Sequence, residues 1–210
     1  MVKSSKREKL KIDVQNTAAR LFRLHGIRAV KMDDISSALK ISKRTLYEIY
    51  DNKHDLLLDV LIKLEEEVRV DIRKHAEDCT NVMDKLIIFF SIRAKYYSET
   101  NPKFFADIQK YPEILNRLKQ RNEEHHRNSE EFFRQGVEEG YFLDTVNYKF
   151  LSRLCNKCME EVHNDEALGA ISISEVFHSF ICVVIRGFCT PKGIEQLDRF
   201  LADLRAKKYI

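Results

Sequence analysis

Three neighbouring side chains near the N-terminus have the chemistry to bind nucleic acid. Lys43, Arg44 and Thr45 follow Ser42 at the start of a short amphipathic stretch. Lysine and arginine donate to phosphate oxygens, and arginine can also bond a guanine edge with two donors. Threonine can bond a base edge or contact a thymine methyl. These residue types therefore predict a surface that binds DNA.

Two short helices must hold these side chains in place. The segment from Met32 to Lys53 has the pattern of two helices of about two turns each, which do not persist alone in water. We expect Asp33 or Asp34 to cap the first and Ser42 to cap the second. Ile41, in the turn between them, is apolar where a free loop is polar, so we expect it to be tucked between the helices. The arrangement is a helix-turn-helix.

Flanking helices supply the support. The first helix is expected to end at Gly26 in a left-handed C-cap, and Asn52 is expected to cap a fourth helix. The apolar stripe of that fourth helix includes Leu57, Val60, Leu61, Leu64 and Val68.

The run from Val14 to Leu61 resembles the DNA-binding segment of the TetR family of bacterial transcriptional regulators, and the resemblance extends over about residues 8–68. The residues that carry it are Ala18, Leu21, Phe22, Gly26, Ile35, Leu46, Tyr47, Tyr50, Lys53 and Leu56. It implies an all-α chain, in which a three-helix DNA-binding domain precedes a larger helical domain for effector binding and dimerisation.

The candidate DNA-binding residues are Lys31, Ser42, Lys43, Arg44, Thr45, Tyr47, Tyr50 and Lys53. The resemblance implies that the Tyr47 hydroxyl reaches a phosphate. Lys53 lies at a helix N-terminus, where the helix dipole also attracts phosphate. For Tyr50, a place in the core is the stronger alternative. The basic N-terminal arm, which contains Lys3, Lys6, Arg7 and Lys9, adds nonspecific attraction to DNA, unless it is simply disordered.

The sequence departs from the family pattern at four positions. Threonine is common where Met32 stands and alanine where Ser36 stands, which puts the start of the second helix in doubt. Glycine is common where Lys40 stands in the turn, and often where Arg44 stands. Arg44 adds a long donor on the side expected to face DNA.

Composition and charge agree with this interpretation. The 210 residues include 44% apolar residues but few glycines (6) and prolines (3), as in a protein of long helices. Residues 1–55 contain 13 Lys/Arg and 7 Asp/Glu, a net charge of +6, so the remaining residues carry +3 − 6 = −3. A basic head on a mildly acidic body predicts a polyanionic partner for the head.

We expect the domain boundary at residue 53, with a DNA-binding domain over 1–53 and a helical domain over 54–210. The helix over residues 172–188 is apolar on nearly every side, so we expect it to be covered on more than one side. The resemblance implies a homodimer joined by the last major helices, which here are those over residues 144–164 and 172–188. A helix buried centrally in a monomer is the alternative. Candidate interface residues are Leu151, Cys155, Cys158, Phe177, Phe180 and Val184.

A helix from Pro112 to Gly136 carries polar residues along its apolar stripe, which predicts either a cavity or a bend that exposes this stretch. The resemblance implies that this central helix borders the pocket of a small-molecule effector. The candidate pocket residues are Phe89, Tyr96, Phe105, Asn122, His125 and Ser129. The aromatic residues among them would equally suit an ordinary core.

Other classes of function are less well supported. Cys155 and Cys158 suggest a redox- or metal-responsive regulator on the same scaffold, but at helical spacing they suit core packing better. The chain has no motif of catalytic residues, so we expect no enzyme, no cofactor and no metal. Without a signal sequence or membrane span, we expect a cytoplasmic protein with reduced cysteines.

Overall fold

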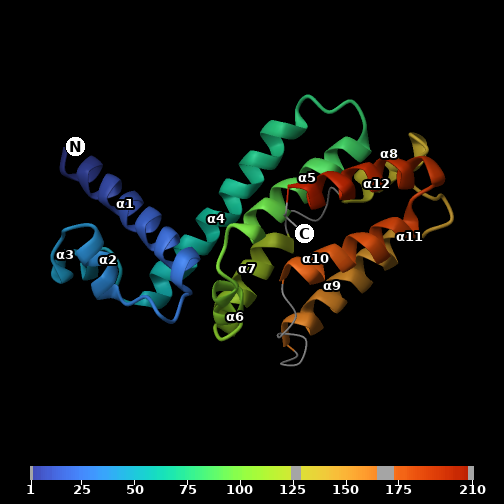
Figure 1. Ribbon diagram of the computed structural model, residues 1–210. Helices are drawn as coiled ribbons and strands as arrows, with labels where there is room; N and C mark the ends of the chain where they lie inside the picture. Colours follow the sequence, from blue (N-terminus) through green and yellow to red (C-terminus); the bar gives the residue numbers. More distant parts are fainter. Residues whose placement is uncertain (1, 124–128, 165–172, 208–210) are drawn as a thin grey trace. The chain divides into compact units, whose positions relative to one another are not determined.

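The computed structural model describes residues 2–123, 129–164 and 173–207, and over these ranges the chain is helical without a β-strand (Figure 1). A single bridge pairs Phe142 with Cys189 within them. The elements are α1 (Val2–His25), α2 (Met32–Ala38), α3 (Lys43–Tyr47), α4 (Lys53–Ala76), α5 (Val82–Ser98), α6 (Pro102–Ile108), α7 (Pro112–Glu123), α8 (Ser129–Glu138), α9 (Tyr148–Asn164), α10 (Ile173–Phe180), a π-helix (Ile181–Ile185), α11 (Arg186–Phe188) and α12 (Pro191–Ala206). The all-α prediction is confirmed.

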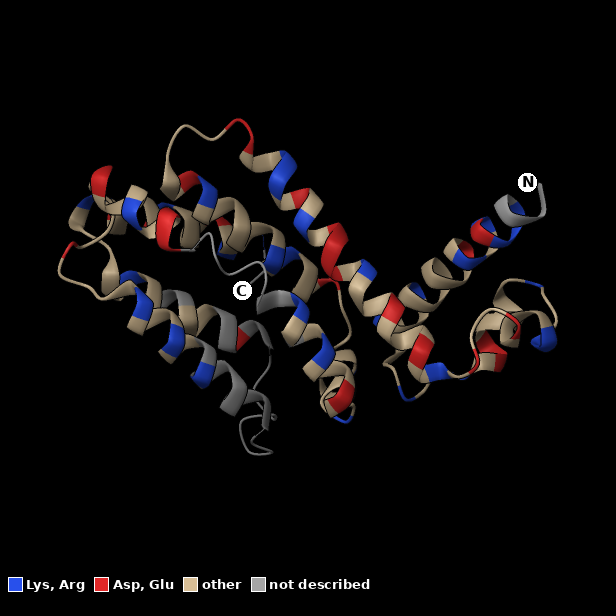
Figure 2. Cartoon of the chain, turned by 180° about the vertical axis from the view of Figure 1, so that it is seen from behind, with Lys and Arg blue, Asp and Glu red and all other residues tan. Residues whose placement is uncertain are grey.

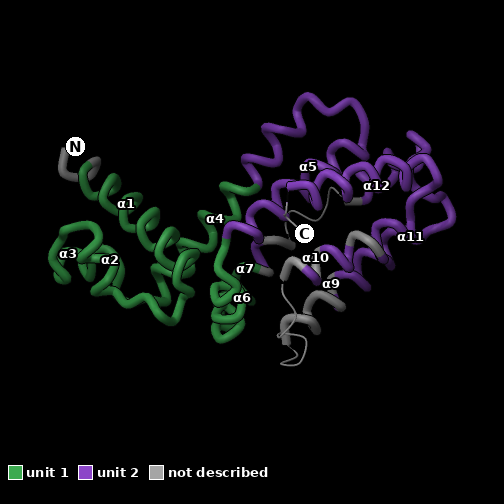
Figure 3. Tube along the Cα trace, viewed as in Figure 1, with its two compact units in different colours: residues 1–68, 100–118 green, residues 69–99, 119–210 purple. Residues whose placement is uncertain are grey.

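The chain forms two compact units (Figure 3). Unit 1 comprises residues 1–68 and 100–118, and unit 2 comprises residues 69–99 and 119–210. Unit 1 thus contains the predicted helix-turn-helix, the first part of α4, all of α6 and the start of α7. The functional boundary at residue 53 stays a prediction, because a compact unit need not coincide with a functional domain.

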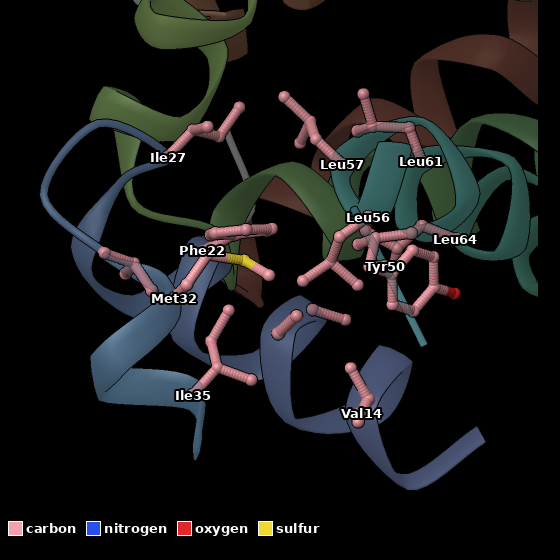
Figure 4. Packing of buried hydrophobic residues seen from close by; sticks show 14 of the residues in the cluster. Val14, Phe22, Ile27, Met32, Ile35, Tyr50, Leu56, Leu57, Leu61 and Leu64 are labelled. Atoms are coloured by element: carbon pink, nitrogen blue, oxygen red, sulfur yellow. The ribbon is translucent and has the colours of Figure 1, made fainter. Parts of the chain in front are cut away.

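The core of unit 1 is the support that the two short helices require (Figure 4). Phe22 from α1, Ile35 from α2, Leu46 from α3 and Leu56 from α4 all have no exposed surface. Burying each of these side chains contributes about 1.5–3 kcal/mol. The apolar stripe predicted for α4 is confirmed, and together with buried residues of α1 it forms the core that holds α2 and α3.

The start of α2 differs from the prediction. The helix begins at Met32, and Lys31 rather than Asp33 or Asp34 occupies the N-cap position. Asp34 instead reaches back from the first turn, where its carboxylate accepts a hydrogen bond from the Lys31 backbone N–H at 2.7 Å. Ser36 is buried, and its hydroxyl donates to the Asp33 carbonyl. The unusual residues at Met32 and Ser36 are therefore compatible with the helix.

In the turn between α2 and α3, Lys40 stands at the position where glycine is common. Lys40 has a φ of 55°, in the left-handed region that a glycine adopts without strain. Its backbone N–H donates to Ser37, and that of Ile41 donates to Ser36. Ile41 packs partly buried against the unit 1 core, as its apolar character predicts.

The end of α1 joins residues 100–118 to the DNA-binding helices. Gly26 has a φ of 86°, which confirms the left-handed C-cap, and its N–H donates to Phe22. The Asn101 backbone N–H donates to the Arg23 carbonyl and its side-chain amide to the Leu24 carbonyl, both at 2.9 Å. Residues near the start of α6 thus bond the last carbonyls of α1.

Unit 2 has its own aromatic core. Phe133 stacks on Tyr148 with ring centroids 4.5 Å apart, and Phe142 meets Phe188 edge to face at 5.1 Å. Gly136 lies against Phe142, so closely that a Cβ there would come within 1.9 Å of the ring.

Two predicted helices of unit 2 differ in detail. Residues 172–188 do not form one uninterrupted α-helix: α10 passes into a π-helix at Ile181 and back to α11 at Arg186. The wider π turn changes which residues point inward, so that Ile185 is buried while Val183 is exposed. The predicted helix from Pro112 to Gly136 is described as α7 and α8, and residues 124–128 between them lie outside the described part of the chain.

Within the described ranges, no helix is both long and apolar enough to span a membrane.

Candidate nucleic-acid interface

The candidate interface is built around α3. Ser42 caps this helix, as predicted: its hydroxyl oxygen accepts from the Thr45 backbone N–H at 3.0 Å. The Thr45 and Ser42 hydroxyls also bond each other at 2.8 Å. These two side chains fix the first turn, and the buried Leu46 fixes which face of α3 points outward.

The basic residues of α3 are exposed. In Arg44, 89% of the side chain is accessible to solvent, and in Lys43 it is 64%. Tyr47 is 46% exposed, although large aromatic side chains are usually buried. The structure therefore places Lys43, Arg44 and Tyr47 on the accessible surface of unit 1, where contact with DNA is possible.

Each basic side chain of α3 has an acidic neighbour. Lys43 Nζ lies 2.5 Å from Asp33 Oδ2, and Arg44 Nε lies 3.0 Å from Glu48 Oε1. The hydrogen bond from Lys43 to Asp33 and their charge attraction raise the pKa of Lys43. Figure 2 shows acidic residues beside basic ones in this part of the chain. Exposed ion pairs of this kind contribute only about 0–1 kcal/mol, so contact with a phosphate or a base can replace them.

The N-terminal arm contacts the far end of the same helix. The basic residues Lys6, Arg7 and Lys9 lie on α1, and the arm is not a separate coil. Arg7 Nη2 donates to the Glu48 carbonyl at 2.9 Å. Sequence patterns did not reveal this contact, because the two residues are 41 positions apart.

Lys53 and Tyr50 are placed differently from the exposed residues. Lys53 is half-buried, and its Nζ donates to the Ile27 carbonyl at 2.6 Å. Burial lowers the pKa of Lys53, while Asp107 and Asp34 act in the opposite direction. Tyr50 is 4% exposed and belongs to the core, the stronger of its two predicted alternatives. Lys31 is exposed at the start of α2.

Tyr50 anchors a polar network that the sequence did not predict. The Tyr50 hydroxyl donates to Asp59 Oδ2 and accepts from Gln15 Nε2, both at 2.9 Å. Lys11 Nζ lies 3.0 Å from the same carboxylate oxygen. Burial alone would raise the pKa of Asp59, but the hydrogen bonds from Lys11, Tyr50 and Gln15 together lower it. This Tyr50–Asp59 network links the residue that follows the helix-turn-helix to α1 and α4.

The candidate effector residues are described only in part. Phe89 is 38% exposed and Tyr96 half-buried in unit 2, whereas Phe105 packs against the core of unit 1. Asn122 lies on α7 and Ser129 on α8, but their side chains are outside the described part, as is all of His125. The effector pocket stays a prediction.

The candidate dimer residues divide in a similar way. Leu151, Phe180 and Val184 are partly buried against the core of unit 2, and Cys155 is half-buried. The side chains of Cys158 and Phe177 lie outside the described part. Phe150 and Leu154 on α9 are 65% and 47% exposed, and Val183 is 72% exposed. The described residues contain no group of three or more His, Cys, Asp or Glu suited to a metal ion.

Comparison with known proteins decides the nature of this segment. Residues 16–60 match the model of the family described as bacterial regulatory proteins, tetR family. The chain carries the DNA-binding segment of the tetR family. The match includes α2, α3, Tyr50 and Lys53, so it contains most of the candidate interface. It confirms the resemblance of residues 16–60 to the tetR family.

Solved structures share the fold beyond that segment. A putative transcriptional regulator from Saccharomonospora viridis, in complex with choline, is 16% identical with a TM-score of 0.61, over 87% of this chain and 99% of that one. A regulator of the TetR/AcrR family from Thermobifida fusca is 18% identical with a TM-score of 0.60, over 85% and 98%. The fatty acid degradation regulator of Bacillus halodurans is 18% identical with a TM-score of 0.58, over 81% and 93%. No curated protein matches the sequence significantly.

Proposed function

We propose that this chain is a tetR-type transcription regulator. It acts as a repressor, which binds a near-palindromic operator as a homodimer and is released by a small-molecule effector bound in its larger domain. The observation that carries the proposal is the exposed basic surface of α3, held by a buried core within the family's DNA-binding segment. A helix presented in this way fits the major groove of B-DNA, which admits one α-helix.

The roles of the side chains follow from their exposure. Lys43 and Arg44 bond phosphates or base edges, and the Tyr47 hydroxyl bonds a phosphate. Ser42 and Thr45 fix the first turn through their mutual hydrogen bond and bring their hydroxyls to the same surface. Lys31, which lies at the start of α2, contacts the DNA backbone. The Lys53 ammonium has three donors, of which one is bonded to Ile27, so it can both hold the loop after α1 and donate to a phosphate.

Exposed apolar side chains support the homodimer. Phe150, Leu154 and Val183 are large, apolar and accessible within unit 2, and they belong to the two segments expected to pair with a second copy. Apolar patches of this kind mark interaction sites on soluble proteins. A second copy that covers these side chains gives the two DNA-binding heads the symmetry that a near-palindromic operator requires.

An effector in the larger domain can release DNA only if its binding changes the DNA-binding domain. Two segments of the chain can transmit such a change. Helix α4 is continuous from Lys53 to Ala76 and so belongs to both compact units. Residues 100–118 belong to unit 1 but lie between two parts of unit 2 in the sequence, and Asn101 bonds the end of α1. A ligand acts by its different affinity for the DNA-competent and DNA-incompetent states. The choline in the Saccharomonospora viridis structure supports a small organic effector, without indicating which one binds here.

Selection from a pool of randomised duplexes tests the DNA-binding part of the proposal. The full-length protein is expected to enrich a sequence with two inverted half-sites, spaced by about one helical turn or a multiple of it. Light scattering is expected to give twice the chain mass of 24.8 kDa in solution. Enrichment of no sequence, or enrichment of single half-sites by a monomer, contradicts the proposal.

The effector part has a separate test. Once a ligand that releases the selected operator has been found, His125→Leu is expected to change the response to that ligand and to leave ligand-free operator affinity nearly intact. Lower ligand-free affinity with an unchanged response would instead identify His125 as a structural residue.

A further inference from the structure

The outermost face of α3 carries one acidic residue beside its basic one. Leu46 has no exposed surface and defines the inward direction of the helix. Because successive residues turn by about 100°, Arg44 and Glu48 each lie about 160° away from Leu46. They are the residues farthest from the core, so in a groove they lie closest to the base edges.

The ion pair between Arg44 and Glu48 involves one nitrogen of Arg44 and leaves the two Nη groups to bond a base. Arg44 bonds Glu48 through Nε, at 3.0 Å. Its two Nη groups form the fork that matches O6 and N7 of guanine. Both side chains are more than half exposed, at 89% and 61%, so water weakens the pair and DNA can replace it.

A carboxylate at the position of Glu48 discriminates between bases because it repels groups that only accept hydrogen bonds. Phosphates repel it, and so do guanine and thymine, whose hydrogen-bonding groups in the major groove are acceptors. Cytosine presents only the N4 amine, a donor, whereas adenine places the N7 acceptor beside its N6 amine. Cytosine is therefore the base that a carboxylate there favours.

We propose that Glu48 determines operator specificity by accepting a hydrogen bond from N4 of a cytosine in each half-site, next to a guanine that Arg44 binds. The inference rests on the proposed function, in which α3 enters the major groove. Four residues of helix rise about 6 Å, and base pairs are spaced about 3.4 Å apart, so the two contacts fall one or two base pairs apart.

Asp33 supplies a matched control. It is another exposed carboxylate, with 51% of its side chain accessible, and it pairs with Lys43 as Glu48 pairs with Arg44. It lies on α2 rather than on the outer face of α3. Loss of its charge should strengthen binding to every sequence alike, because it removes repulsion from phosphates without removing a base contact.

The experiment compares full-length wild type, Glu48→Ala, Glu48→Gln and Asp33→Asn at one salt concentration. Sequences are first selected from randomised duplexes with each protein, and fluorescence anisotropy then gives the Kd for the selected duplex and for its single-base variants. For wild type, replacing the proposed cytosine in one half-site is expected to weaken binding about fivefold to about a hundredfold.

The Glu48→Ala variant is expected to bind duplexes with any of the four bases at that position with Kd values within about twofold of one another. This small difference is the preference that remains when an exposed surface makes no specific contact. Glu48→Gln is expected to move the preference from cytosine to adenine, since a glutamine amide matches N6 and N7 of adenine. Asp33→Asn should keep the wild-type preference.

The proposal is overturned if Glu48→Ala keeps the cytosine preference, or if it strengthens binding to all duplexes equally, as Asp33→Asn should. It is also overturned if the selected half-site contains no cytosine within two base pairs of the guanine. If wild type selects no sequence at all, the proposed DNA-binding function fails as well, and that result is distinct from the others.

Discussion

The Tyr50–Asp59 network offers a test of how the DNA-binding helices are held. Tyr50→Phe removes the hydroxyl that donates to Asp59 and accepts from Gln15, and it leaves the ring in the core. A hydrogen bond to a charged group contributes about 1.5–3 kcal/mol. The neighbouring pair of Lys11 with Asp59 is about a third exposed on each side and survives the substitution. We therefore expect Tyr50→Phe to lower the free energy of unfolding by about 1.5–3 kcal/mol at pH 7.

The effect should depend on pH with a definite sign. The pKa of Asp59 is lower in the folded protein than its ordinary value of 3.8, so its carboxylate stabilises the fold above that value. This stabilisation is lost as the pH falls through the folded pKa. The difference between wild type and Tyr50→Phe should therefore shrink below pH 3.8.

Urea unfolding followed by circular dichroism measures both quantities. Tyr47→Phe is the matched control, because Tyr47 is nearly half exposed and lies on the adjacent helix. Changes at exposed positions are usually within about 0.5 kcal/mol. Equal stability of the Tyr50→Phe and Tyr47→Phe variants, or a difference that stays constant as the pH falls through the folded pKa of Asp59, would refute a stabilising role for the network.

Three further substitutions test other features of the fold. Lys40→Gly should stabilise the protein by up to about 1 kcal/mol in urea unfolding, because relief of the left-handed φ exceeds the entropic cost of glycine; a destabilised variant would contradict this. Gly26→Ala should destabilise it by about 1–3 kcal/mol, since φ is 86° and the new Cβ would lie 3.0 Å from Lys103 Cβ; thermal unfolding at the wild-type temperature would show that the turn adapts. Val183→Glu should give folded monomers in light scattering, because Val183 is exposed. The Val184 side chain packs on the core of unit 2, so Val184→Glu should lose helical signal in circular dichroism. A Val183→Glu dimer would exclude Val183 from the interface.

The sequence predicted local features well wherever one residue type had one physical role. Ser42 and Asn52 cap their helices, Gly26 takes the left-handed C-cap, and Ile41 packs in the turn. In each case the backbone conformation needs that kind of side chain, so position in the sequence was sufficient. The strained φ of Lys40 follows from the same logic, because the turn needs a left-handed residue there whether or not it is glycine.

Contacts between distant residues could not be predicted in this way. The Tyr50–Asp59 network needs Gln15 and Lys11 from α1, and the Arg7 contact with Glu48 spans the whole helix-turn-helix. Nor did the sequence show that Asn101 bonds the end of α1 and so joins residues 100–118 to the rest of unit 1. These contacts depend on how helices pack, and hydrophobic periodicity shows only which face of a helix is buried.

Within the candidate interface, the ion pair of Arg44 with Glu48 was not predicted, although the sequence carried a signal for it. Arg44 and Glu48 are four residues apart on a helix whose inward residue is Leu46, and that spacing alone places them side by side and outward. The π-helix at Ile181–Ile185 had a weaker one, since β-branched residues, which make up most of this run, suit a regular α-helix less well. There the change of register decides whether Val183 or Val184 faces outward, and the sequence could not decide it.

The affinity of one double variant for the selected operator tests the central claim most directly. Lys43→Ala with Arg44→Ala should keep the fold, because both side chains are exposed, and should lose about 1–3 kcal/mol of binding free energy for each base contact removed. Arg199→Ala with Arg205→Ala on α12 makes the same change in net charge away from α3 and should bind nearly as wild type. Wild-type affinity in the α3 double variant, with folding verified by circular dichroism, would show that α3 does not read the operator.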